Sequence, residues 1–188
     1  MFTKKIFAIA ILATSILATS CLKNDTTPTT TTPTYTDPSL EISAIDHFTD
    51  SMGFDNMQYA SLTGFKYETV ELGDTSVAGK ITNELPVGTF KYKVTLLNGT
   101  GVDSSYNLTN GTVTVNFVSQ SVSTIPSIML TDIWSYVFFN TSVPRKIGKG
   151  GHLRFVTPSA YTYVYYANAY YSTKPLFVDV YLTNVSAL

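Results

Sequence analysis

Residues 89–106 read TFKYKVTLLNGTGVDSSY, and this stretch decides how the chain around it is expected to fold. Its first half alternates between polar residues and an apolar side made of Phe90, Tyr92, Val94 and Leu96. A period of two is typical of a β-strand with one buried face. The pair Asn98-Gly99 then tolerates the positive φ of a tight turn. Residues 102–105, VDSS, follow as an acidic and hydroxyl-rich return, so the stretch predicts a strand, a turn and a short polar partner strand.

The composition of the whole chain favours a sheet and excludes several classes of partner. Of its 188 residues, 44% are hydrophobic and only 13% charged, with 13 Tyr and 11 Phe against a single Trp. Aromatic residues of this kind suit β-sheets. The net charge of -1 leaves no basic surface for nucleic acid. Two isolated His residues and one Cys predict neither a metal site nor a cofactor.

The first twenty residues have the features of an export signal. Lys4 and Lys5 precede an apolar run over residues 6–17, which is too short for a permanent membrane span. Small residues then lead to Cys21, an order that resembles the bacterial lipobox, with Leu17 one place further from the cysteine than usual. That resemblance makes Cys21 the lipidated first residue of a mature protein anchored to a membrane. An ordinary signal peptide with an incidental cysteine is the alternative.

A threonine- and proline-rich linker separates this signal from the folded part. Residues 22–37 read LKNDTTPTTTTPTYTD, which cannot bury a core, so a disordered tether is expected over residues 21–37. Thr26 is either a glycosylation site or part of a plain solvated spacer. Leu22 replaces the Asp that in some bacteria retains lipoproteins at the inner membrane, and we therefore expect the outer membrane of a bacterial envelope.

The folded part is expected to comprise an N-terminal helical segment over residues 38–62 and a domain over residues 63–188. Asp37 as N-cap and Pro38 as the first helical residue predict a helix that Gly53 ends. Its apolar side is expected to hold Ile45, Phe48 and Met52. Further strands are predicted over residues 63–72 and 112–118, and a helix follows the capping pair at residues 131–132.

Four segments, in order, resemble the FKBP-type peptidyl-prolyl cis-trans isomerases. Residues 92–105 resemble the family's YTGxLxxGxxFDSS core, and residues 130–134, LTDIW, resemble its Val-Ile-x-Gly-Trp. Residues 158–163, PSAYTY, resemble Pro-Ser-x-Leu-Ala-Tyr-Gly, and residues 176–182, LFVDVYL, resemble the closing strand. The resemblance implies an α+β fold, with an antiparallel half-barrel β-sheet wrapped around one short helix. The N-terminal helix is an addition to that plan.

The resemblance also implies a site for proline-containing polypeptides. Trp134 would form its floor, Tyr163 would donate to the carbonyl before proline, and Asp103 would accept a hydrogen bond from Tyr92. The remaining pocket positions, implied as substrate-binding, are Val102, Val115, Phe117, Leu130, Thr131 and Val178. Isomerisation needs no proton transfer, covalent intermediate, metal or cofactor, because only rotation about the amide bond is catalysed. An aromatic or Val residue on an alternating strand is, however, more often a core residue.

Departures from the family pattern predict a divergent isomerase with weak or lost activity. Val102 and Val178 stand where the family has Phe, Ile133 replaces the Gly before Trp134, and residues 93–94 replace Thr-Gly. Two rival functions stay open. One is a non-catalytic chaperone or peptide-binding module that uses the same groove, and the other is a glycan-binding β-domain that stacks sugars on tyrosines such as Tyr165 and Tyr166. A monomer is expected in each case.

Overall fold

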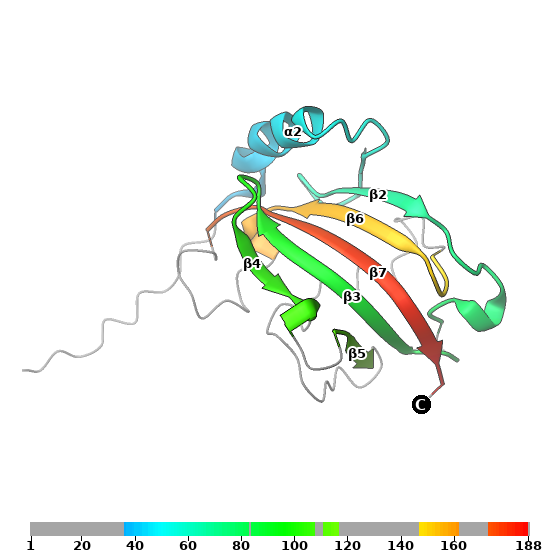
Figure 1. Cartoon of the computed structure of the whole chain (residues 1–188). Coiled ribbons are helices and arrows are strands. Elements are labelled where there is room, and N and C mark those ends of the chain that lie inside the picture. Colours follow the sequence, from blue (N-terminus) through cyan, green and yellow to red (C-terminus); the bar gives the residue numbers. More distant parts are fainter. Residues whose placement is uncertain (1–35, 83, 108–110, 117–146, 162–172, 188) are drawn as a thin grey trace, which may run out of the picture. The chain divides into compact units, whose positions relative to one another are not determined.

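The computed structural model describes residues 36–82, 84–107, 111–116, 147–161 and 173–187 (Figure 1). All of them belong to the compact unit Tyr35–Leu188, which is distinct from Met1–Thr34. Seven strands form one antiparallel sheet in the order β1-β2-β6-β7-β3-β4, and β5 pairs with β3 off that path. The strands are β1 (Gln58–Tyr59), β2 (Lys66–Glu71), β3 (Val87–Leu96), β4 (Gly101–Ser104), β5 (Val113–Asn116), β6 (His152–Thr157) and β7 (Leu176–Ser186).

Strand β3 is the predicted alternating strand, and it lies between β7 and β4 in the sheet. The four side chains of its predicted apolar side are between 0% and 3% exposed, which confirms the predicted buried face. Gly99 has φ +85° in the turn after β3, a conformation that glycine adopts without steric cost. Strand β4 then runs back antiparallel to β3, as the sequence predicts. The predicted antiparallel sheet is therefore confirmed.

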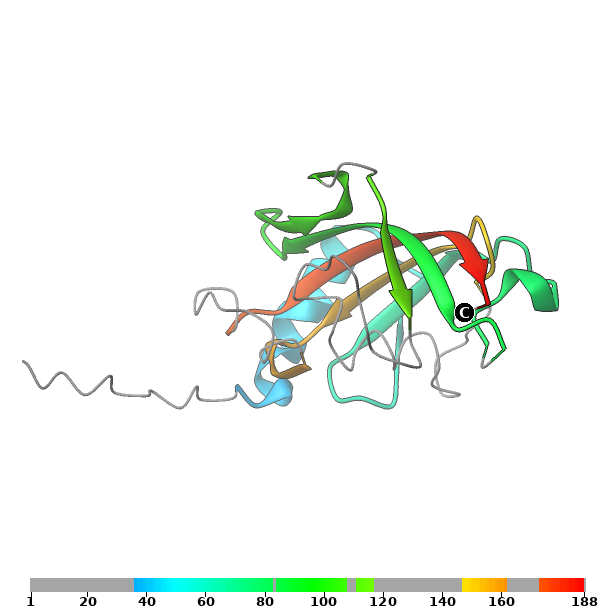
Figure 2. The ribbon, with the colours of Figure 1, turned by 90° about the horizontal axis from the view of Figure 1, so that it is seen from below.

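The main core lies on the face of the sheet that carries the β3 apolar side chains, here called the inner face. Phe65, Phe90, Tyr92 and Phe155 are completely buried in it. Strands β6 and β7 add alternate residues to the same cluster, including Leu153 and Val180. Strand β5 pairs antiparallel with the start of β3, over residues 87–90 (Figure 2). The helix predicted after residues 131–132 lies outside the described residues.

A helix packs against the opposite, outer face of the sheet (Figure 1). The 3-10 turn η1 (Pro38–Glu41) leads into α2 (Ile42–Ser51), and Asp37 caps it by accepting the Ser39 N–H at 2.9 Å. The N-terminal helix and its cap are thus confirmed. Ile45 and Phe48 of α2 contact Val156 and Phe177 of the sheet, and Phe177 lies 5.4 Å from Phe48 between ring centroids. The helix ends one residue before Met52, which is 51% exposed rather than on the buried side.

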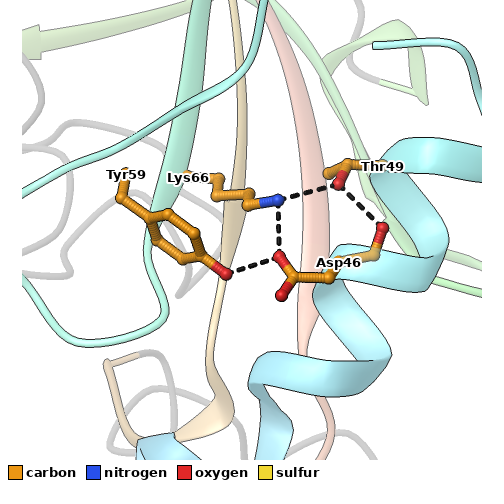
Figure 3. Close-up of polar contacts among 4 residues, drawn as sticks. All are labelled: Asp46, Thr49, Tyr59 and Lys66. Carbon is orange, nitrogen blue, oxygen red and sulfur yellow. Dashed lines mark hydrogen bonds and ion pairs between the residues drawn. The ribbon is translucent and has the colours of Figure 1, made fainter. Parts of the chain in front are cut away.

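A polar cluster, here called the outer clamp, fixes α2 to β1 and β2 (Figure 3). The Lys66 ammonium lies 2.5 Å from the Asp46 carboxylate and donates to Thr49 Oγ1 at 3.1 Å. Tyr59 donates its hydroxyl to the same carboxylate, and the Lys66 ammonium lies 4.7 Å from the centre of its ring. The sequence predicts Lys66 on the polar side of its strand. It is nevertheless buried, because α2 covers that side and the cluster neutralises its charge.

Short elements complete the described fold. Besides η1, the 3-10 turns are η2 (Val77–Gly79), η3 (Ser105–Asn107) and η5 (Ser159–Tyr161). Strand β1 lies within the segment predicted as helical, so residues 38–62 also provide an edge strand of the sheet. Within the described ranges, no helix is both long and apolar enough to cross a membrane.

Candidate functional site

Two of the predicted site residues meet where β3 faces β4. The Tyr92 hydroxyl donates to Asp103 Oδ2 at 3.0 Å, which is the contact that the family resemblance implies for these positions. Asp103 lies opposite Val94 in the ladder, and Val94 in turn lies opposite Val178 of β7. Because residues paired across antiparallel strands share a face, Asp103 belongs to the inner face. The pair thus places one buried ring and one half-buried carboxylate at the end of the core.

The two serines after Asp103 explain why the chain holds this geometry. Ser105 is fully buried, and its Oγ accepts the Tyr92 N–H at 2.9 Å while donating to the Gly111 carbonyl at 3.2 Å. The Ser104 hydroxyl donates to the Tyr92 carbonyl at 3.3 Å. Side-chain oxygens therefore satisfy the backbone of β3 at the point where β4 ends, as buried polar groups require. Residues 103–105, DSS, thus bind Tyr92 together. The two serines bond to its backbone in β3, and the Asp103 carboxylate accepts its hydroxyl.

The environment of Asp103 disfavours its charged form. Burial raises the pKa of its carboxyl, and this effect outweighs the opposing hydrogen bonds from the Ser104 backbone and the Tyr92 hydroxyl. The Ser104 N–H donates to Asp103 Oδ1 at 2.7 Å, so both carboxylate oxygens have a donor. Neutral donors thus hold this carboxylate in place.

The apolar residues predicted to contact substrate divide into two groups. Val115 and Val178 are 3% and 1% exposed, and both belong to the main core cluster. Val102 packs against that cluster but is only partly buried, like Asp103 beside it. Among the predicted site residues that the structure describes, Val102 and Asp103 are therefore the two still partly exposed to solvent. Five predicted positions lie outside the described residues, namely Phe117, Leu130, Thr131, Trp134 and Tyr163, as does the predicted lipidation site Cys21.

His152 has polar and aromatic partners that the sequence does not predict. It begins β6 and is buried, with Nε2 bonded to Asp179 Oδ1 and its ring stacked on Tyr181 at 4.0 Å between centroids. Arg154 Nε lies 3.5 Å from the same Asp179 oxygen, so this carboxylate contacts both the His152 imidazole and the Arg154 guanidinium. Among the described residues, no group of three or more His, Cys, Asp or Glu side chains could hold a metal ion.

Another unpredicted contact joins η1 to η5. The Glu41 carboxylate is buried and accepts both the backbone N–H and the hydroxyl of Ser159, each at 2.7 Å. Tyr161, two residues further on, donates its hydroxyl to the Thr63 carbonyl at 3.1 Å. The chain separation of 118 residues between Glu41 and Ser159 leaves no local sequence signal.

Comparison with solved structures finds proteins with a similar fold. FkpA from Escherichia coli matches with a TM-score of 0.52 and 22% identity, over 79% of this chain and 61% of the FkpA chain. AtFKBP13 matches at 0.49 and 15% over 67% and 95%, and a peptidyl-prolyl cis-trans isomerase from Pseudomonas syringae pv. tomato at 0.48 and 16% over 81% and 98%. No family model and no curated protein sequence matches the chain. This chain thus has an FKBP-like fold, and it spans about three fifths of the FkpA chain.

Proposed function

We propose that this protein is a peptidyl-prolyl cis-trans isomerase of the FKBP type that assists protein folding in a bacterial envelope. The observation that carries the proposal is the hydrogen bond from Tyr92 to Asp103. It lies on the inner face of an FKBP-like sheet, between the two residues that the family resemblance pairs. The serines behind it reproduce the DSS part of that motif with a distinct role for each side chain.

The chemistry asked of such a site is modest. The barrier to rotation about an X–Pro bond is about 18–20 kcal/mol, and it falls when a site favours the twisted amide over the planar one. A dry apolar pocket for the proline ring does this, together with a donor to the preceding carbonyl. In the proposal Trp134 is the floor of the pocket, Tyr163 is the donor, and Tyr92 and Asp103 form one wall.

We further propose that the activity is weak. Val102 stands at the partly exposed rim, where the family has a larger aromatic side chain. Loss of ring surface widens the pocket, so a proline ring buries less apolar area against it. Val178 has the same effect from beneath, since it is 1% exposed and provides less bulk to the core under the site.

The proposed setting of the protein follows from the residues before the folded unit. Acylation of Cys21 anchors the chain, and residues 22–37 tether a monomeric domain at the outer membrane. In that setting the substrates are proline-containing polypeptides of the envelope. Labelling of the chain with a fatty-acid analogue, lost in Cys21→Ser, tests the anchor separately from the activity.

The decisive experiment is a protease-coupled isomerisation assay on residues 34–188. We expect slow but measurable catalysis for this domain and none for Trp134→Ala with an unchanged circular dichroism spectrum. Tyr106→Ala is the matched control, because this aromatic side chain is 59% exposed and should leave the rate unchanged. Catalysis that survives in Trp134→Ala would refute the proposed site, and an inactive parent domain would refute the proposed activity.

One observation favours a second candidate, a peptide-binding module without catalysis. The rim residue Val102 and the core residue Val178 leave an apolar surface that suits general apolar side chains as well as proline. An inactive domain that binds apolar peptides with and without proline equally well would support this alternative. A preference for proline peptides of tenfold or more would exclude it.

A further inference from the structure

The 3-10 turn η1 is bonded to the turn η5 through a buried carboxylate. Glu41 is 8% exposed and Ser159 is 1% exposed, and the two carboxylate oxygens accept the N–H and the hydroxyl of Ser159 separately at 2.7 Å. Figure 2 shows η1, in blue, beside η5, in orange-brown. Two hydrogen bonds to one carboxyl group fix both the position and the orientation of the residue that donates them. The N-terminal segment therefore determines where η5 lies.

A third segment closes around the same contact. Gly64 has φ +75°, and a Cβ at this position would lie 2.9 Å from Pro158 Cγ and 3.3 Å from the Pro38 carbonyl oxygen. The Tyr161 hydroxyl bonds to the carbonyl of Thr63, the neighbour of Gly64. Residues 38–42, 62–65 and 158–161 thus converge without space for another methyl group. We call these three segments the N-terminal junction.

The register of the sheet connects this junction to the candidate site. Phe155 of β6 lies opposite Val178, which lies opposite Val94, which lies opposite Asp103. The turn η5 begins two residues after Thr157, the last residue of β6, so it leaves the sheet at the end where Asp103 lies. Tyr161 packs against the inner-face cluster that contains Tyr92. The turn held by Glu41 is therefore on the same face and at the same end as the Tyr92–Asp103 pair.

We propose that Glu41 is a positioning residue of the isomerase site, acting through Ser159 on the turn beside the bound peptide. The inference rests on the proposed function. It makes the N-terminal helical segment part of the working unit rather than a spacer between tether and domain. A displacement of about 1 Å at a site that positions a substrate can cost a hundredfold in rate, so loosening one side of the site has a measurable effect.

The test compares variants of the full-length protein in detergent, assayed where circular dichroism shows each to be fully folded. Glu41→Gln keeps the size of the side chain but leaves one acceptor oxygen, and we expect its kcat/KM to fall about tenfold. Ser159→Ala removes only the hydroxyl donor, and about a threefold loss is expected. Glu84→Gln is the matched control, since Glu84 is exposed and should keep the parent rate.

Two further measurements separate positioning from general stability. The double variant Glu41→Gln/Ser159→Ala should lose no more kcat/KM than Glu41→Gln alone, because both substitutions disrupt the same contact between Glu41 and Ser159. Amide exchange at Ser159 should accelerate in Glu41→Gln while exchange in β3 stays at the parent rate. Additive losses, or parent-like kcat/KM in both single variants of an active protein, would overturn the inference and leave the proposed function intact. An inactive parent protein would instead overturn the proposed function, and the inference with it. If Glu41→Gln does not fold, the kcat/KM of Ser159→Ala tests the inference.

Discussion

Among the described residues, each face of the sheet carries a pair in which a tyrosine hydroxyl donates to an aspartate. On the outer face Tyr59 bonds to Asp46 in the outer clamp, and on the inner face Tyr92 bonds to Asp103. In the first pair a cation also contacts the carboxylate, because the Lys66 ammonium is bonded to Asp46. The same two residue types are therefore placed in opposite electrostatic surroundings.

The pKa shifts record this difference. Hydrogen bonds from Lys66 and Tyr59 lower the pKa of Asp46, while burial raises the pKa of Asp103. Burial, together with the Asp46 hydrogen bond, raises the pKa of Tyr59 to about 12. The outer pair thus favours the ionised carboxylate and strengthens the attachment of α2. The inner pair holds a carboxyl group in surroundings that disfavour its ionised form. Carboxyl groups with such perturbed pKa values are common at functional sites.

The largest difference is expected when each tyrosine is truncated. Tyr92 is completely buried, so Tyr92→Ala should lower the free energy of unfolding by about 3–5 kcal/mol through lost burial and a large cavity. Tyr59 is 50% exposed, and Tyr59→Ala should cost about 1 kcal/mol. Urea unfolding of the two variants measures both values. Equal costs would mean that the two tyrosines contribute alike and that the contrast between the faces is wrong.

A smaller effect is expected from removing the cation of the outer clamp. Lys66→Met keeps the apolar stem under α2 but leaves Asp46 and Thr49 without the ammonium, and a loss of about 1–2 kcal/mol should follow. Lys93→Met, at an exposed position of β3, is the control and should change stability by less than about 0.5 kcal/mol. Thermal unfolding followed by circular dichroism compares them. A neutral Lys66→Met would show that apolar packing alone holds the helix.

The smallest effect concerns pH, and it should have opposite signs on the two faces. The lowered pKa of Asp46 means that its contribution is complete above the unfolded value of 3.8 and is lost as the pH falls below it. The raised pKa of Asp103 means that stability is greatest below 3.8 and declines as the pH rises through the raised value. Asp46→Asn should therefore reduce the loss of unfolding free energy that the parent protein shows as the pH falls below 3.8. Asp103→Asn should reduce the decline of the unfolding free energy above pH 4.

Each of these changes should be below about 1 kcal/mol, because both carboxylates are partly exposed. Urea unfolding at intervals from pH 3 to pH 6, with the parent protein beside both variants, resolves the two profiles. Profiles that move in the same direction would contradict the assignment of the two shifts.

The sequence predicts the parts of this molecule whose cause is local. The alternation of β3, the positive φ of Gly99 and the cap at Asp37 follow from spacing and residue type, and the structure confirms each. The Tyr92–Asp103 contact was accessible through the family motif, since its residues lie 11 apart on a hairpin. What could not be predicted depends on distant packing. Lys66 is buried because a helix covers it, and Glu41 finds Ser159 only after the sheet has formed.

Strand β7 pairs with β3 on one side and β6 on the other, although it is the last strand along the described chain. Without it, β1-β2-β6 and β3 with its partners are two separate sheets, and neither can close the main core. Cooperative folding therefore requires that β7 has been synthesised, and contacts between residues so far apart in the sequence form slowly.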